Sequence, residues 1–121
     1  FAERVRERQR DLQGLLSSLH VNGSTICALG ASTKGNVLLQ SSGIGTALID
    51  AVGDVNPYKY GRVTPGTHIP IVSEADALAM APDYLLILPW HFRETFMTSL
   101  APYLAGGGRL IFPLPDIEIV G

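Results

Sequence analysis

A glycine turn between two apolar segments is the feature that most constrains the fold of this chain. Residues 30–35 read Gly-Ala-Ser-Thr-Lys-Gly, after a strand-like run at 25–29 and before a helix-like run at 36–41. In α/β proteins, a strand that breaks at glycine and continues as a helix aims free N–H groups and a partial positive charge at an anion. The turn therefore predicts an α/β fold with an anion site, to which Lys34 adds a full charge.

The turn departs from both known phosphate-binding fingerprints. Against Gly-x-Gly-x-x-Gly, Gly30 and Gly35 take the outer positions, but Ser32 replaces the middle glycine, where backbone must approach a pyrophosphate. Against the P-loop, Lys34 precedes the second glycine and no Ser or Thr is placed for magnesium. We therefore do not expect a nucleotide triphosphatase, and a purely structural glycine turn stays an alternative to an anion site.

Strand-like and helix-like segments alternate along the chain. Expected helices cover residues 2–19, 35–41, 73–80 and 92–104, and expected strands cover 25–29, 46–52, 69–72, 83–88 and 109–112. The apolar run at 84–88 predicts a strand buried on both faces, as in parallel sheets covered by helices. We expect a Rossmann-like, doubly wound α/β fold with about five mostly parallel strands in three α/β/α layers. The polar stretch 56–68 is expected to be a long functional or mobile loop.

Composition narrows the class of protein. A net charge of −2 gives no sign of a nucleic-acid partner, and no apolar run approaches the roughly 20 residues that span a bilayer, so no membrane partner is expected. Cys27 is the only cysteine and falls in an apolar strand, which predicts a buried thiol and a reduced, cytoplasmic compartment. No cluster of His, Cys, Asp and Glu has metal-ligand spacing, so no metal is expected.

The N-terminal region is rich in arginine. The chain starts at Phe1 without a methionine and leads into a charged helix with arginines at positions 4, 6, 8 and 10. We expect residues 1–22 to be a helix and linker from a preceding domain, and residues 23–121 to form the Rossmann-like domain. The arginines are expected to be solvated or to contact another domain.

Several polar and aromatic residues follow the expected strands, where open parallel sheets bind ligands. Asp54 lies 24 residues beyond Gly30, near the position where an acidic side chain accepts hydrogen bonds from ribose in dinucleotide folds. An equal alternative is that Asp54 only starts a turn. Trp90 is placed to wall a pocket, to stack on a base or to pack on the next helix. His91 and His68 are candidates for hydrogen bonding to substrate, because no catalytic partner is assignable to either.

Four motifs in order give the chain a more specific likeness. They are Gly-Ala-Ser-Thr-Lys-Gly-Asn at 30–36, Asp54 to Pro57 with Lys-Tyr-Gly at 59–61, Thr-Pro-Gly-Thr-His-Ile-Pro at 64–70, and Leu-Pro-Trp-His-Phe at 88–92. Together they resemble the C-terminal domain of sugar C-methyltransferases, which act on nucleotide-linked deoxysugars. The resemblance covers residues 12–115.

The resemblance implies that substrate and methyl donor bind in different domains. Members of this family have a zinc-binding region and an S-adenosylmethionine domain upstream of a Rossmann-like C-terminal domain that closes over the nucleotide-sugar. This chain would then hold a dTDP-linked keto-deoxysugar, while S-adenosylmethionine binds in the upstream domain of the same protein. The residues implied to bind substrate are Gly30, Ala31, Ser32, Thr33, Lys34, Gly35, Asn36, Asp54, Asn56, Lys59, Thr67, His68, Trp90 and His91. The catalytic base is unassigned, with His91 as the candidate.

Two other readings of the sequence stay open. One is an NAD(P)-type nucleotide-binding module, supported by the spacing of Gly30 and Asp54 but weakened by Ser32 at the middle position. The other is a noncatalytic scaffold whose N-terminal helix docks on a partner domain, so that the glycine turn is only structural.

Overall fold

The computed structural model describes residues 2–114 and 116–121. The helices are α1 (Ala2–Val21), α2 (Thr33–Ser41), α3 (Glu74–Ala79), α4 (Arg93–Ser99) and α5 (Ala101–Ala105), with short 3₁₀ helices η1 (Pro57–Lys59) and η2 (Trp90–Phe92). The strands are β1 (Ile26–Leu29), β2 (Val52–Asp54), β3 (Ile71–Ser73), β4 (Tyr84–Ile87), β5 (Arg109–Phe112) and β6 (Glu118–Val120).

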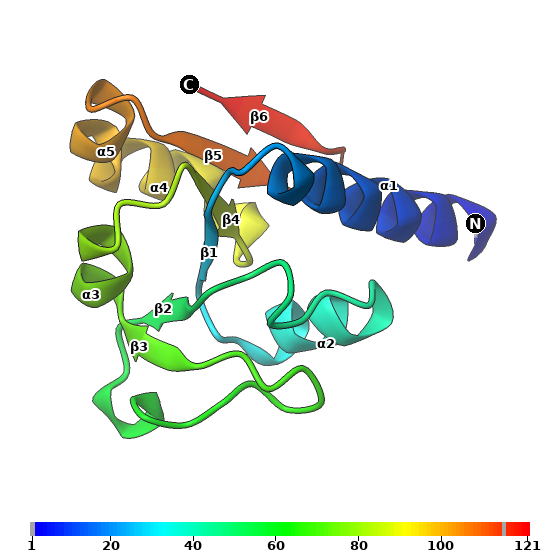
Figure 1. Ribbon diagram of the computed structural model, residues 1–121, viewed down its shortest axis with the longest axis horizontal. Coiled ribbons are helices and arrows are strands. Elements are labelled where there is room, and N and C mark those ends of the chain that lie inside the picture. The colour runs from blue at the N-terminus through cyan, green and yellow to red at the C-terminus, as the bar shows by residue number, and fades with distance from the viewer. Residues whose placement is uncertain (1, 115) are drawn as a thin grey trace.

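The strands form one mixed sheet in the order β3-β2-β1-β4-β5-β6 (Figure 1). All neighbouring pairs are parallel except β5 and β6, which are antiparallel. The chain starts in the middle of the sheet, moves outward through β2 and β3, and returns to β4, so strand order reverses between β1 and β4. The expected doubly wound α/β fold is confirmed, with six strands in place of about five. The short edge strand β6 escaped prediction because its pairing with β5 is a contact that no local pattern reveals.

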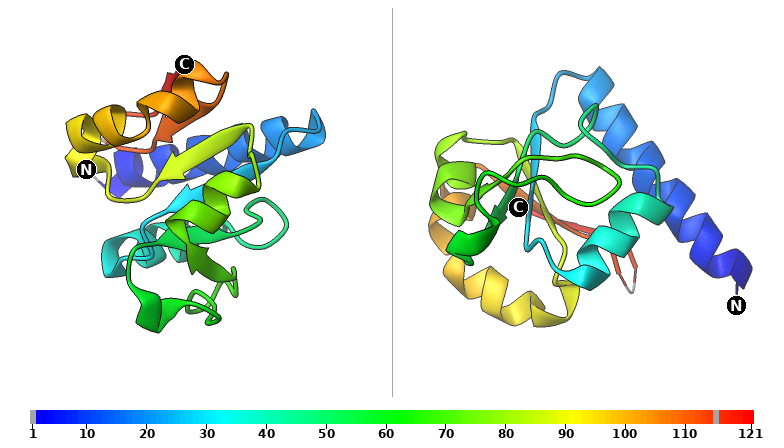
Figure 2. Two further views of the ribbon diagram at one scale, coloured as in Figure 1. Left: turned by 90° about the vertical axis from the view of Figure 1, so that its left-hand side faces the viewer. Right: turned by 90° about the horizontal axis from the view of Figure 1, so that it is seen from below.

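Helices cover both faces of the sheet, in three layers (Figure 2). On one face, α1 and α2 pack over side chains that include Ile26, Ala28 and Leu86. On the other face, α3, α4 and α5 pack over Cys27 and Leu29, which belong to a second hydrophobic core. Successive residues of β1 thus enter opposite cores, which explains why this strand and β4 are apolar throughout.

Helix α1 belongs to the first of these cores. Leu12 and Leu16 are fully buried within it, and Leu15 and Leu19 pack against it from partly exposed positions. The apolar spacing that predicted this helix therefore identifies its buried face. The expected domain boundary at residue 22 stays a prediction. No helix within the described residues is long and apolar enough to cross a membrane.

Two sequence predictions about β2 and the segment before it were wrong. The strand expected at residues 46–52 is a turn region, in which Leu48 and Ile49 donate backbone hydrogen bonds to Gly45 at 3.0 Å, and the strand itself is Val52–Asp54. Ile49 and Ala51 are buried without belonging to a strand, so the apolar signal reflects burial. Gly53, just beyond the expected strand, lies inside β2, and the close approach of Leu29, 2.8 Å from where a Cβ would be, leaves room only for glycine there.

Two other elements also differ from expectation. The single helix expected at residues 92–104 is α4 and α5, since Pro102 lacks the N–H that a continuous helix needs and sits in the first turn of α5. The stretch 56–68, expected to lack elements, contains η1 and one arm of a short hairpin, in which Thr64 and Ile69 are joined by a backbone hydrogen bond of 2.9 Å. The hairpin carries little apolar periodicity, which is why its sequence resembles a loop.

Candidate functional site

The glycine turn, residues 30–35, ends β1 and starts α2 at the carboxyl edge of the sheet. Ser32 caps the helix, because its hydroxyl accepts from the Gly35 N–H at 3.1 Å and its carbonyl accepts from the Asn36 N–H at 2.8 Å. This geometry leaves the N–H groups of Thr33 and Lys34 without intrahelical partners. Both residues are exposed, and no ion pair to Lys34 occurs among the side chains that the structure describes.

Close packing requires both glycines that frame this turn. Gly30 has a φ of +87°, and a Cβ there would collide with the ring of Pro89, 2.5 Å from its Cδ. A Cβ on Gly35 would lie 2.8 Å from the Cβ of Leu88. The turn therefore packs directly on the end of β4, next to the point where strand order reverses. Close packing therefore explains the presence of both glycines, whether or not an anion binds at the turn.

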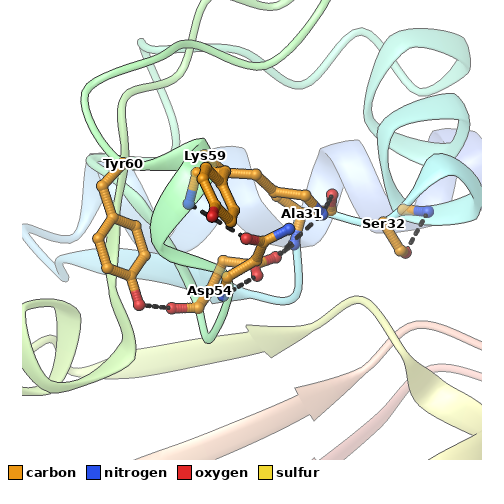
Figure 3. Close-up of polar contacts among 8 residues, drawn as sticks. Ala31, Ser32, Asp54, Lys59 and Tyr60 are labelled. Atoms are coloured by element: carbon orange, nitrogen blue, oxygen red, sulfur yellow. Dashed lines mark hydrogen bonds and ion pairs between the residues drawn. The ribbon is translucent and has the colours of Figure 1, made fainter.

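Asp54, the last residue of β2, lies at the centre of a polar network (Figure 3). Its Oδ2 accepts from the Ala31 N–H at 2.8 Å and its Oδ1 accepts from the Asn56 N–H at 2.8 Å. The Nζ of Lys59 lies 3.5 Å from Oδ2 and donates to the Ala31 carbonyl at 2.9 Å. The Tyr60 hydroxyl donates to the Asp54 carbonyl at 2.8 Å. We call these five residues the Asp54 network.

The network favours the ionised form of Asp54. Burial of the carboxyl acts to raise its pKa, but the N–H groups of Asn56 and Ala31, together with the charge of Lys59, outweigh it and hold the pKa below the ordinary value. A carboxylate is therefore present at neutral pH, with three donors around it and a side chain only 8% exposed.

Two hollows flank the glycine turn. The switch-point cleft, of about 440 Å³, is lined by turn residues Gly30 and Ser32 and also by Asp54, Lys59, Pro89 and Phe92. The α1–α2 groove, of about 520 Å³, is mostly apolar and is lined by Thr33, Lys34, Val37, Leu38, Trp90 and Leu114 among others. The N-terminus of α2 thus stands between two spaces large enough for parts of a small molecule.

Part of this lining was predicted from the sequence. The predicted site residues that line one hollow or the other are Gly30, Ser32, Thr33, Lys34, Asp54, Lys59 and Trp90. Four lining residues were not predicted as site residues, because apolar side chains carry no chemical signal: Phe92, Pro89, Val37 and Leu114. Their positions after strands or on α2 were the only available indication.

Other predicted site residues lie farther from the turn. Thr67 and His68 are in the hairpin that rests on the last turn of α2, where Gln40 donates to the Pro65 carbonyl at 2.5 Å. His91 is exposed on η2, with its ring 5.0 Å from that of Trp90, and no carboxylate partner for it is present among the described residues. Neither hollow includes these three residues in its lining. Their contact with a substrate stays a prediction.

Neither a metal site nor a reactive thiol adds to this candidate site. No group of three His, Cys, Asp or Glu residues within the described chain is arranged to hold a metal ion. Cys27 is buried in β1, and burial, with the nearby charge of Asp50 adding to it, raises the pKa of its thiol to about 11. The thiol is therefore neutral at physiological pH and poorly reactive.

The fold and these hollows define a Rossmann-like α/β domain with a ligand-sized cleft at its switch point. Residues 1–115 match the model of the C-methyltransferase C-terminal domain, and the chain belongs to that family. The chain is also similar to the C-methyltransferase NovU of Streptomyces niveus, with 35% identity over 118 residues. The match covers 98% of this chain but only 27% of that relative.

The carboxylate at the end of β2 bears on which nucleotides this site is able to bind. In dinucleotide-binding Rossmann folds, an acidic side chain at this place accepts hydrogen bonds from ribose hydroxyls. The carboxylate at that place, Asp54, already accepts from Ala31 and Asn56 and faces Lys59. These protein contacts of the Asp54 carboxylate weaken the alternative of an NAD(P)-binding module.

Proposed function

We propose that this chain is the substrate-holding domain of an S-adenosylmethionine-dependent C-methyltransferase that acts on a dTDP-linked keto-deoxysugar. The observation that carries the proposal is the N-terminus of α2, where two N–H groups and the side chain of Lys34 are available to a diphosphate between two hollows. The hollows are able to receive the groups on either side of that diphosphate.

The reaction explains why such a holding domain is useful. Methylation at carbon needs a nucleophilic carbon, which a keto sugar provides when a base removes the proton next to its carbonyl. S-adenosylmethionine, held outside this chain, would supply the electrophilic methyl group. The residues of the glycine turn would fix the diphosphate, and binding energy from that distant group then orients the reacting carbon. The base remains unassigned, with exposed His91 as a candidate.

The effect of Lys34→Ala on dTDP binding tests the proposal in the full-length protein. A single charge-assisted contact with phosphate contributes enough that we expect about tenfold weaker binding of dTDP by calorimetry. Lys34 is exposed near the start of α2, so its removal should leave the thermal midpoint unchanged. Arg62→Ala is the matched control, because it removes one exposed positive charge on the segment leading to β3.

The outcomes separate the candidate functions. Weaker dTDP binding in Lys34→Ala, with normal binding in Arg62→Ala, supports a phosphate role for the turn. Equal affinity in all three proteins removes that role. NAD and S-adenosylmethionine serve as parallel ligands: tighter binding of NAD, lost with Lys34, would move the chain to the cofactor-binding class. Absence of any nucleotide binding would favour the scaffold.

A further inference from the structure

The Asp54 network holds one residue of the glycine turn from two sides. Ala31 donates its N–H to Asp54 at 2.8 Å, and its carbonyl accepts from Lys59 at 2.9 Å. Both polar backbone groups of this residue are therefore satisfied by side chains from the segment after β2. Ala31 itself is 4% exposed, so neither bond is readily replaced by water.

These two hydrogen bonds to Ala31 lie directly next to the N-terminus of α2. Ser32, which caps α2, follows Ala31 in the chain, and its own N–H donates to the Gly30 carbonyl at 2.9 Å. Any rotation of the Ala31 peptide groups would therefore turn the cap and redirect the N–H groups of Thr33 and Lys34. The direction in which α2 presents these donors is set one residue upstream.

The other end of the network is also fixed. The Asp54 carboxylate accepts from the Asn56 N–H, the Asn56 side chain accepts from the Tyr58 N–H at 3.1 Å, and the Tyr60 hydroxyl returns to the Asp54 carbonyl. Lys59 lies in the 3₁₀ turn so formed, which aims its Nζ at Ala31. The segment 54–60 is thus a rigid support whose charged groups face the glycine turn.

From this geometry we propose that Asp54 and Lys59 are positioning residues, which hold Ala31 so that the N-terminus of α2 binds phosphate, and that Asp54 is not a ligand of the ribose. The proposal rests on the proposed function for what the turn binds. It differs from the usual role of an acidic residue at the end of β2, which accepts bonds from the nucleoside. Here that carboxylate is 8% exposed and is engaged by protein donors.

Two ligands distinguish positioning from direct contact. Inorganic pyrophosphate carries the diphosphate alone, whereas dTDP also carries the nucleoside. If Asp54 acts through the turn, Asp54→Asn should weaken both ligands by the same factor, about tenfold, because a single charge-assisted hydrogen bond near the site is lost. If Asp54 binds the nucleoside, only dTDP should weaken. Both affinities are measured in the full-length protein by competition against labelled dTDP.

Hydrogen exchange reports on the turn without any ligand. In Asp54→Asn, the peptide covering residues 30–35 should exchange faster, while the peptide covering β4 stays protected. Lys59→Met keeps the aliphatic stem and should also speed exchange at this peptide, which provides a second variant if Asp54→Asn folds poorly. Asp50→Asn is the control, because it makes the same chemical change at an exposed residue before β2.

Each outcome has a defined meaning. Faster exchange at 30–35 with equal losses for the two ligands in both variants supports the proposal. Loss of dTDP binding alone, with unchanged exchange, overturns it and makes Asp54 a nucleoside ligand. Loss of both ligands in Lys59→Met with unchanged exchange also overturns it, since Lys59 would then contact phosphate directly. Faster exchange in a protein whose wild type binds neither ligand would keep the support role for the turn and reject the proposed function.

Discussion

The connection between β2 and β3 has two halves that are held in place by different chemistry. The first half, residues 55–60, is organised around a buried charge, the Asp54 carboxylate, with backbone donors and Lys59 around it. The second half, residues 61–70, is a hairpin arm and turn closed by neutral groups: the fully buried Thr64 accepts from the Ile69 N–H at 2.9 Å through its hydroxyl. The Thr67 hydroxyl also contacts that of Thr64.

The two halves support opposite ends of α2. The first reaches Ala31, beside the start of the helix, and the second reaches Gln40, in its last turn. A charged network shapes the end that we propose binds phosphate, whereas a neutral one fixes the end away from it. The length of this connection therefore does not imply mobility, because each half is fixed by specific polar contacts. Only the contacts of the first half depend on an ionised group.

Removal of the charge should have the largest effect on stability. Asp54→Ala leaves two backbone N–H groups without their acceptor and Lys59 without its ion-pair partner. We therefore expect the unfolding free energy to fall by about 2–3 kcal/mol, less than for a fully buried pair because Lys59 is partly exposed. Urea denaturation of wild type and variant measures the difference. A loss well below 1 kcal/mol would show that water replaces the carboxylate and that the two halves do not differ as described.

The corresponding change in the second half should be smaller. Thr64→Val keeps the shape of the side chain but leaves the buried Ile69 N–H without its acceptor, which costs about 1–2 kcal/mol. Because the hairpin contacts α2 at its last turn, the end opposite the glycine turn, dTDP affinity should stay within about twofold of wild type, a change well under 1.4 kcal/mol. A tenfold loss of affinity in a stably folded Thr64→Val protein would place the second half in the nucleotide site.

The sequence revealed the elements whose signals are local. The central strands β1 and β4 were predicted from apolar runs, and α3 was predicted to begin at Ser73, which caps it by accepting from the Asp76 N–H at 3.0 Å. The glycine turn was likewise found from its own residues. Pro102 also carried a local signal, but the predicted helix ran through it.

The features that were missed depend on distant contacts. Asp54 was placed near the turn, but the bond from Ala31 spans 23 positions of the chain, and nothing local indicates that its carboxylate is already occupied. The hairpin of the second half pairs Val63 with Pro70 in an isolated bridge, and β6 pairs antiparallel with β5. The segment that contains Ile49 and Ala51 resembled a strand because burial alone gives an apolar pattern.

Acid should weaken the contacts of the first half and leave those of the second half unchanged. The pKa of Asp54 is lower in the folded chain than its ordinary value near 3.8, so its stabilising contribution is complete above that value and is lost as pH falls through the lower, folded pKa. The stability difference between wild type and Asp54→Asn should therefore be constant above about pH 5 and shrink below about pH 4. The difference between wild type and Thr64→Val should be the same across this range, because no carboxyl takes part in the Thr64 contacts.

The smallest effect concerns the backbone of the second half. His68 has a φ of +58°, in the left-handed region, and its side chain is exposed. His68→Gly removes that strain but increases the freedom of the unfolded chain, so we expect a net change below about 0.5 kcal/mol. His68→Val should cost about 1 kcal/mol or more, since a branched side chain tolerates this conformation poorly. If both variants bind dTDP normally but His68→Gly weakens the intact nucleotide-sugar, the imidazole contacts the sugar; equal binding of both ligands would limit the second half to supporting α2.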